Sequence, residues 1–289
     1  MAKKYNLHFS LESLSPFKAY FLGLMWADGW ITSNGNGCAL SSNDSEIEII
    51  NNILYPEKNH PIETRPSGCK IIHICNKNLV NQLKNFGFVS DKSKNGVPII
   101  PLEYEKYWML GLLDGDGCIY QKDGKCLRVF FSGNEQTLLL VQDYFRNNFS
   151  IEFIKKLANR KNGQIDKRIL PNNNICYQLQ TKGYKDAQII IEHLYSGAIE
   201  NHIPFYRRKY QKYIDFINVR KGMNECKLCH EDFIRTGSTQ KYCKECSALL
   251  IKLRNRQQYE YNNYGFMMDL QFLLKPDDKQ IDLIELSTL

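Results

Sequence analysis

Two short stretches of this chain repeat one pattern. Residues 21–29 read FLGLMWADG, and residues 109–117 read MLGLLDGDG. Each stretch predicts an apolar helix that carries small residues four positions apart and ends in Asp-Gly before a strand-like run. Small residues at that spacing lie on one face of a helix, so two such helices can bring their backbones unusually close. The repetition indicates an internal structural duplication.

The last acid of each copy, Asp28 or Asp116, lies where the helix dipole is already negative, so its carboxylate does not help to stabilise its helix. Two copies that pack together would place both carboxylates in one strongly negative pocket. A divalent cation makes such a pocket tolerable, so the pair predicts a metal site. A single copy is more often a core helix with a glycine stop, but the repetition favours the site.

Both copies resemble the signature of the LAGLIDADG homing endonucleases, in the single-chain form with two motifs. Residues 87–94 and 206–210 also resemble recurrent segments of that family, and the resemblance covers about residues 14–220. It implies a site-specific endonuclease that hydrolyses both strands of double-stranded DNA with Mg²⁺ or another divalent cation. The catalytic residues and metal ligands that it implies are Asp28 with the carbonyl of Ala27, and Asp116 with the carbonyl of Gly115.

The order of predicted elements indicates an α+β fold with two pseudo-symmetric halves, each a helix, hairpin, helix, hairpin and helix. The first half has strands at 30–33 and 38–42, a helix capped by Asn43 or Asp44, strands at 60–65 and 69–75, and a helix at 78–85. The second half has strands at 118–122 and 126–132, a helix at 135–145, strands at 151–160 and 175–181, and a helix at 185–193. The resemblance implies that the motif helices form the interface and that the antiparallel sheets form a DNA-binding saddle.

Four parts are expected along the chain. They are a first half at residues 14–100, a second half at 101–220, a zinc-binding module with a basic helix at 221–264, and an acidic tail at 265–289. The tail has no predicted task.

Polar side chains of the hairpins are the candidates for DNA contact. A two-stranded ribbon fits the major groove, and alternate side chains of a strand point to the same side. The candidates are Thr32, Asn34, Asn36, Arg65, Lys70, Gln121, Lys125, Arg128, Lys156, Arg160, Gln178 and Gln180. The resemblance also implies a basic or polar side chain near the metal. Lys182 is the preferred candidate, and the first half offers His73 or Lys77.

Four cysteines form two CxxC pairs on one short segment: Cys226, Cys229, Cys243 and Cys246. Four thiolates in a tetrahedron suit Zn²⁺ and leave no open position, so the pattern predicts a structural zinc site and argues against a redox role. The flanking chain is basic, with tyrosines between the charges. Two interpretations of the module stay open, an additional DNA contact and a zinc-stabilised structural element.

The net charge is +7, but the last 25 residues carry five acids against two lysines, so residues 1–264 hold +10. That asymmetry favours a polyanionic partner over a small metabolite, and a solvated basic surface is the alternative that charge alone leaves open. The start of the chain lacks an apolar secretory signal, and the sequence contains no run long enough to span a membrane. We therefore expect an intracellular protein without membrane contact, of cytoplasmic, organellar or viral origin. A monomer is expected because one chain supplies both motif helices.

Three functions fit these patterns. The first is an endonuclease of a mobile intron or of a free-standing mobile gene. The second is an intron RNA maturase, and the third is a catalytically inactive DNA-binding regulator of the same fold. The presence of both Asp28 and Asp116 argues against the regulator, but it does not separate the endonuclease from the maturase.

Overall fold

The protein is described from a computed structural model, which covers residues 5–57, 60–157, 160–161, 164–165, 176–221, 223–234 and 240–264. The chain divides into two compact units. The first contains Met1–Gln121 and Cys126–Ile214, and the second contains Lys122–Lys125 and Asp215–Leu289. The predicted acidic tail lies outside the described residues. None of the described helices is both long and apolar enough to cross a membrane.

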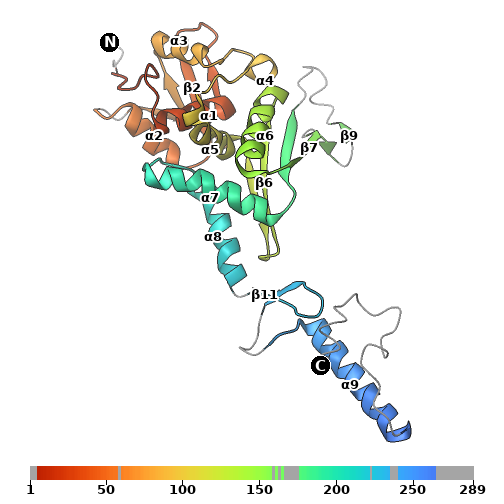
Figure 1. Ribbon diagram of the computed structural model, residues 1–289. Coiled ribbons are helices and arrows are strands. Elements are labelled where there is room, and N and C mark those ends of the chain that lie inside the picture. Colours follow the sequence, from red (N-terminus) through yellow and green to blue (C-terminus); the bar gives the residue numbers. More distant parts are fainter. Residues whose placement is uncertain are drawn as a thin grey trace. The chain divides into compact units, whose positions relative to one another are not determined.

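The first half of unit 1 contains a four-stranded antiparallel sheet in the order β1-β2-β4-β3. Helices precede, interrupt and follow its strands (Figure 1). The elements are α1 (Pro16–Asp28), β1 (Gly29–Ile31), β2 (Cys38–Ser42), α2 (Glu46–Leu54), β3 (Ile62–Thr64), β4 (Lys70–Ile74), α3 (Lys77–Asn85) and α4 (Lys92–Asn95).

The second half repeats this arrangement in a sheet of order β5-β6-β10-β7. Its elements are a 3₁₀ turn (Leu102–Tyr104), α5 (Glu105–Gly115), β5 (Cys118–Lys122), β6 (Cys126–Gly133), α6 (Glu135–Phe149), β7 (Phe153–Leu157), β10 (Tyr177–Thr181), α7 (Tyr184–Glu200) and α8 (Arg207–Lys221). Two further short strands, β8 (Arg160–Lys161) and β9 (Gln164–Ile165), pair with each other in a separate antiparallel sheet. The predicted α+β class and its two antiparallel sheets are confirmed.

Helices α1 and α5 lie side by side at the centre of unit 1 (Figure 1). A Cβ atom at Gly23 would lie 2.0 Å from the carbonyl oxygen of Trp108, and one at Gly111 would lie 2.2 Å from that of Tyr20. Both distances are far shorter than a carbon–oxygen contact allows, so the two backbones approach this closely only because both positions are glycine. The predicted close packing of the motif helices is confirmed.

Two sequence-based details were wrong. The N-cap position of α2 is Ser45 and not Asn43 or Asp44, and the Ser45 side chain makes no capping hydrogen bond. The Asp44 carboxylate accepts hydrogen bonds from Arg208. The strand predicted at 151–160 ends at Leu157, because its partner β10 begins at Tyr177, which pairs with Leu157. Arg160 therefore belongs to β8 and not to the four-stranded sheet.

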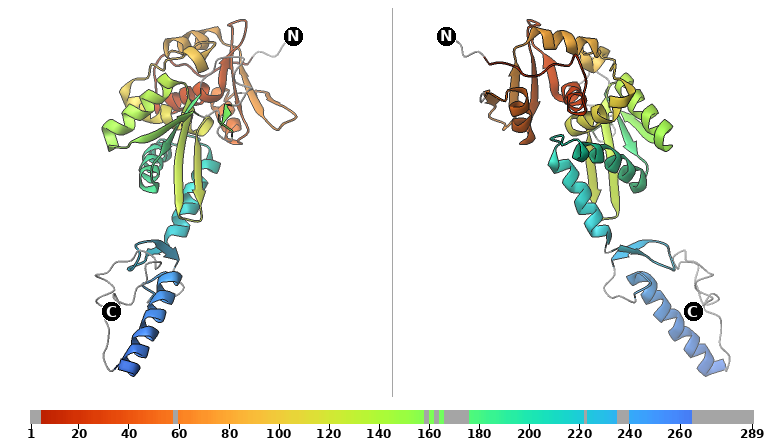
Figure 2. Two further views of the ribbon diagram at one scale, coloured as in Figure 1. Left: turned by 90° about the vertical axis from the view of Figure 1, so that its right-hand side faces the viewer. Right: turned by 60° about the vertical axis from the view of Figure 1, so that its left-hand side comes forward.

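Unit 2 contains the hairpin β11 (Met223–Glu225) and β12 (Asp232–Ile234), followed by α9 (Lys244–Tyr264). Helix α9 is one continuous helix (Figure 2). A small apolar core joins the hairpin region to the first half of α9. The core is formed by Cys226, Leu228, Phe233, Cys243, Cys246, Leu250 and Leu253. Helix α9 begins between the last two cysteines and contains Cys246.

Replacement of Gly23 or Gly111 by alanine tests the contact between α1 and α5. The added methyl group collides with backbone atoms of the other helix, so each variant should lose more than about 2 kcal/mol of unfolding free energy in urea. Gly183→Ala is the matched control, because Gly183 has open space around it and an ordinary negative φ. Equal stabilities of the three variants would contradict the observed packing.

Candidate functional site

The two predicted acids meet where the motif helices end. Asp28 is the last residue of α1, and Asp116 directly follows α5 as its C-cap. A Cβ atom at Gly115 would lie 2.2 Å from the Cβ of Ala27 and 3.0 Å from a carboxylate oxygen of Asp28. The structure thus brings together all four residues that the resemblance implies as metal ligands. Metal binding by them stays a prediction.

The pair of carboxylates is electrostatically strained. Burial, together with the nearby charge of Asp116, raises the pKa of Asp28 to about 6. Asp116 has a solvent-exposed surface, but the protein atoms around its carboxylate still raise its pKa. The charges of Lys92 and Lys209 oppose both shifts. The site therefore holds negative charge only at an energetic cost, which a bound cation would relieve.

Lys92 closes the C-terminal end of α1. Its ammonium group donates hydrogen bonds to the carbonyl oxygens of Met25 at 3.0 Å, Ala27 at 2.8 Å and Trp26. Burial lowers the pKa of Lys92 to about 8, although both aspartates favour its charged form. A cation at this helix end offsets the negative pole of the helix.

Lys209 does the same for α5. Its ammonium group donates to the carbonyl oxygens of Leu113 at 2.8 Å, Gly115 at 3.1 Å and Gly117 at 2.6 Å, and also to that of Asp114. Only 4% of its surface is exposed, and burial lowers its pKa. The two halves therefore use equivalent lysines, each from a segment distant in sequence from the helix that it contacts.

These two lysines were not predicted as site residues from the sequence. They lie within the segments 87–94 and 206–210, which resemble recurrent family segments. That resemblance was the available signal, because a lysine recurs in both segments. Neither spacing nor composition shows that the two ammonium groups reach the ends of the motif helices.

The placement of Lys182 near the metal was wrong. Lys182 follows β10, and Cys176 at the other end of that strand lines the pocket beside Asp116. A five-residue strand spans about 16 Å, so the two strand ends lie far apart. The charge of Lys182 instead helps to lower the pKa of Glu152. In the first half, the His73 imidazole lies 2.7 Å from a carboxylate oxygen of Glu63, and Lys77 begins α3.

Asp114 has a structural role. Its carboxylate accepts hydrogen bonds from the hydroxyl groups of Tyr20 at 2.9 Å and Tyr195 at 2.8 Å, and from the backbone N–H of Tyr206 at 2.9 Å. Only 1% of the residue is exposed. It therefore ties α1, α7 and the segment before α8 to α5. The matching position of the first motif is Trp26, whose indole N–H donates to Thr137.

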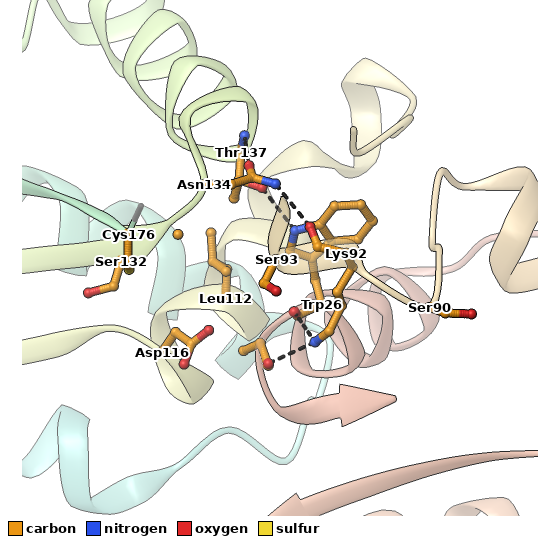
Figure 3. Close-up of a pocket in the computed structure, with 12 residues that line it drawn as sticks. Trp26, Ser90, Lys92, Ser93, Leu112, Asp116, Ser132, Asn134, Thr137 and Cys176 are labelled. Atoms are coloured by element: carbon orange, nitrogen blue, oxygen red, sulfur yellow. Dashed lines mark hydrogen bonds between the residues drawn. The ribbon is translucent and has the colours of Figure 1, made fainter. Parts of the chain in front are cut away.

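A cavity of about 260 Å³ opens beside Asp116 (Figure 3). Asp116 and Lys92 contribute to its wall together with the polar residues Ser93, Ser132 and Asn134. Figure 3 also shows the Lys92 ammonium group bonded to backbone oxygens of α1 at this wall. The cavity gives a polar molecule access to the Asp116 carboxylate.

Four of the predicted DNA contacts lie on one face of the second sheet. Gln178 is directly opposite Lys156 in the register, and the Lys156 ammonium group donates to the Gln180 side chain at 2.9 Å. Arg128 lies on the same face, because Gln180 pairs with Phe130, two residues further along β6. Ser132 pairs with Gln178 and also lines the cavity, so this face is continuous with Asp116. We call Arg128, Lys156, Gln178 and Gln180 the outer polar face.

The remaining second-half candidates lie elsewhere. Gln121 is on the side of β5 that carries the buried Ile119, since the two residues are two positions apart. Lys125 is exposed and belongs to the turn in unit 2. The side chain of Arg160 lies outside the described residues.

The first-half candidates are engaged in local contacts. The Lys70 ammonium group binds Glu48 of α2 at 2.7 Å, and Lys70 pairs with Ser42 on the face opposite Ser41. The Ser41 hydroxyl donates to the carbonyl oxygen of Asp28, so Lys70 is not on the Asp28 side of this sheet. In the β1–β2 turn, the Asn34 side-chain oxygen accepts hydrogen bonds from the Thr32 hydroxyl and from the backbone N–H of Asn36. The Arg65 guanidinium lies 3.6 Å from a carboxylate oxygen of Glu63.

The four cysteines of unit 2 form a compact cluster in which all the sulfur atoms lie within 4.8 Å of one another. Hydrogen bonds, led by the backbone N–H of Cys243, outweigh burial and lower the pKa of the Cys226 thiol, whereas burial raises the pKa values of Cys243 and Cys246. A thiolate is the form that binds metal. Four sulfur donors this close fit one tetrahedral ion with bonds of about 2.3 Å.

No protein-family model matches the chain, and no curated protein sequence matches it. Full-length DUF199/WhiA from Thermatoga maritima aligns with a TM-score of 0.47 and 15% identity, over 89% of this chain and 77% of that chain. The homing endonuclease I-DmoI in complex with DNA and Mn has a TM-score of 0.41 and 15% identity, over 62% of this chain and 96% of that chain. The homing endonuclease I-WcaI bound to its DNA recognition sequence has a TM-score of 0.41 and 14% identity, over 68% of this chain and 87% of that chain.

Asp28→Asn tests the electrostatics of the site. Because the folded-state pKa of Asp28 is raised, its ionised form destabilises the fold. That cost is absent below about pH 4, grows as the pH rises, and is complete above about pH 6. In Mg²⁺-free buffer the variant should therefore be more stable than the wild type at pH 8, by at most about 3 kcal/mol, and equally stable at pH 4.

Thermal unfolding at the two pH values makes the comparison. Asp186→Asn, in the first turn of α7, is the control and should give no stabilisation at pH 8. A melting temperature of Asp28→Asn that stays at or below the wild-type value at pH 8 would contradict the raised pKa.

Proposed function

We propose that the protein is a site-specific endonuclease that hydrolyses double-stranded DNA with a divalent cation held by Asp28 and Asp116. The observation that carries this proposal is the meeting of two carboxylates, one from each half, at touching helix ends that are each closed by a lysine. A purely structural helix contact does not require acids at this position, because they raise its energy.

The donor set fits Mg²⁺. The candidate ligands are carboxylate and backbone carbonyl oxygens, which Mg²⁺ prefers, and Asp116 opens to a cavity that has room for water and phosphate. The carbonyl oxygens of Ala27 and Gly115 already accept a hydrogen bond from a lysine, but a carbonyl oxygen has a second lone pair. When bound, the cation would supply charge stabilisation for the phosphoryl group and a more acidic water.

The residues of the chain provide the remaining functions in this proposal. Asp28 and Asp116 would hold the cation, with one carboxylate serving each DNA strand. Lys92 and Lys209 fix the helix ends and place a positive charge beside each acid, which favours the approach of a phosphate. With a pKa of about 8, Lys92 is mostly protonated at neutral pH.

The proposed DNA surface includes the outer polar face of the second sheet. Glutamine side chains can form paired hydrogen bonds with adenine, and arginine with guanine, in the major groove. The two halves present different side chains, so we propose an asymmetric DNA site and a monomeric enzyme. The division into halves at 14–100 and 101–220, and a module at 221–264, belongs to the same proposal.

A DNA-binding regulator without catalysis is the second candidate. Lys92 and Lys209 already offset part of the negative charge at the helix ends. That arrangement allows the fold to persist with no metal bound. Sequence-specific binding by a wild-type protein that cuts no DNA with Mg²⁺ would favour this candidate.

Asp28→Asn and Asp116→Asn should each abolish double-strand cleavage and leave DNA binding intact or slightly tighter. Removal of one carboxylate also removes its repulsion of phosphate. The cleavage rate should fall about a thousandfold, which corresponds to about 4 kcal/mol in the barrier. The measurement is incubation with a plasmid library, with and without Mg²⁺, followed by mapping of the cut ends. Asp186→Asn is the control, and full cutting by both site variants would refute the proposed chemistry.

We further propose that the cysteine cluster binds one structural Zn²⁺. Cys243→Ser should release that zinc and unfold the segment around the cluster, because small sites of this kind draw their folding energy from the metal. Metal analysis and circular dichroism measure both effects, and the exposed Cys75 offers the control variant Cys75→Ser. Absence of zinc from the reduced wild-type protein would overturn this assignment.

A further inference from the structure

Helix α9 has two distinct sides. One side packs on the cysteine cluster, where Cys246, Leu250 and Leu253 are buried. At 100° per residue, the exposed residues lie on the opposite side of the helix and, at Arg254, on the flank beside Leu250. We call it the outer α9 face, and its members are Lys244, Ala248, Ile251, Lys252, Arg254, Asn255, Gln258, Tyr259 and Asn262.

The chemistry of the outer α9 face is selective. It carries three cationic side chains and three side-chain amides. Ile251 and Tyr259 are also prominent, with 61% and 63% of their surfaces exposed. One acid, the exposed Glu245 of the first turn, lies about 20° from Lys252 around the helix, so cations outnumber acids by three to one on the exposed side.

The length of α9 exceeds what the cluster requires. Its 21 residues span about 32 Å. Leu253 is the last residue of α9 in the small core of unit 2, as far as its side chains are described. About three further turns follow Leu253, and they carry Arg254, Asn255 and Gln258. A helix that continues beyond its own core, with amides and cations outward, is shaped to contact a partner.

We propose that the outer α9 face binds in the major groove of a DNA segment that flanks the cleaved site. The major groove is about 12 Å wide and admits one helix. Lys244, Lys252 and Arg254 would contact phosphates and fix the helix in the groove, while Asn255 and Gln258 would read base edges. The inference depends on the proposed function in one respect, that DNA is the partner of the protein.

DNA matches this face better than an acidic protein surface does. An acidic protein would be bound by the cations alone, whereas the amides also present both donors and acceptors. The Gln258 amide donates to the Asn262 side-chain oxygen at 2.9 Å, which leaves Gln258 its oxygen and second N–H and leaves Asn262 its NH₂ group. Paired donors and acceptors are what a base edge, and adenine in particular, requires. The metal cluster at the start of α9 would hold the helix rigidly for this contact.

Two double variants of the full-length protein test the inference. Asn255→Ala with Gln258→Ala removes the proposed base contacts, and Lys252→Ala with Arg254→Ala removes two phosphate contacts. The matched control is Lys84→Ala with Lys185→Ala, which removes two lysines from helices of unit 1. Zinc content and circular dichroism confirm that each variant is folded. The probe is a duplex of the mapped cut site or, where the wild type does not cut, of the site that it selects by binding, with long natural flanks. It is compared with the same site in randomised flanks.

For the amide variant we expect about tenfold weaker binding to natural flanks and no preference for them over randomised flanks. For the charge variant we expect uniformly weaker binding, and a plot of log affinity against log salt that is less steep by about 2. The control should match the wild type in both measurements. Wild-type affinity, flank preference and salt slope in both double variants would overturn the inference.

The two proposals fail in different ways. If the wild type cuts its site and the α9 variants behave as the wild type does, only the α9 contact is overturned. If the wild type binds DNA with a flank preference that depends on α9, but never cuts, the endonuclease proposal fails and the α9 contact stands.

Discussion

Gly23 and Gly111 let the backbones of α1 and α5 touch, because neither residue has a Cβ atom that would strike the other helix. The remaining geometry of unit 1 follows from this contact. Once the helices cross there, their C-terminal ends meet at Ala27 and Gly115, and the next acids lie together. Each sheet begins directly after its helix, so each half extends outward from the same point.

The meeting of two negative helix ends creates the electrostatic problem that the rest of the site addresses. The two helix dipoles and the two carboxylates repel one another. Burial and the nearby charge of Asp116 raise the pKa of Asp28. Lys92 and Lys209 relieve part of it from segments that are distant in sequence. The incomplete relief is the physical basis of the proposal that this site binds a divalent cation.

Local patterns predicted the strands and the motif helices well, because hydrophobic periodicity and Asn-Gly or Asp-Gly turns act over a few residues. The four residues at the meeting helix ends were also predicted, through repetition and a family resemblance. The lysines at the helix ends were not, because a long flexible side chain reaches across the fold and its target is set by tertiary packing. Lys182 was misplaced for a different reason. A position at the end of a strand does not show which end of that strand faces the site.

Binding of Mn²⁺ to the complex with cognate DNA, followed by electron paramagnetic resonance, tests the central claim most directly. We expect bound Mn²⁺ in the wild-type complex, clear loss in Asp28→Asn and in Asp116→Asn, and full retention in Asp186→Asn. Undiminished Mn²⁺ binding in both site variants would show that the two acids at the meeting helix ends do not hold the cation, and would contradict the account.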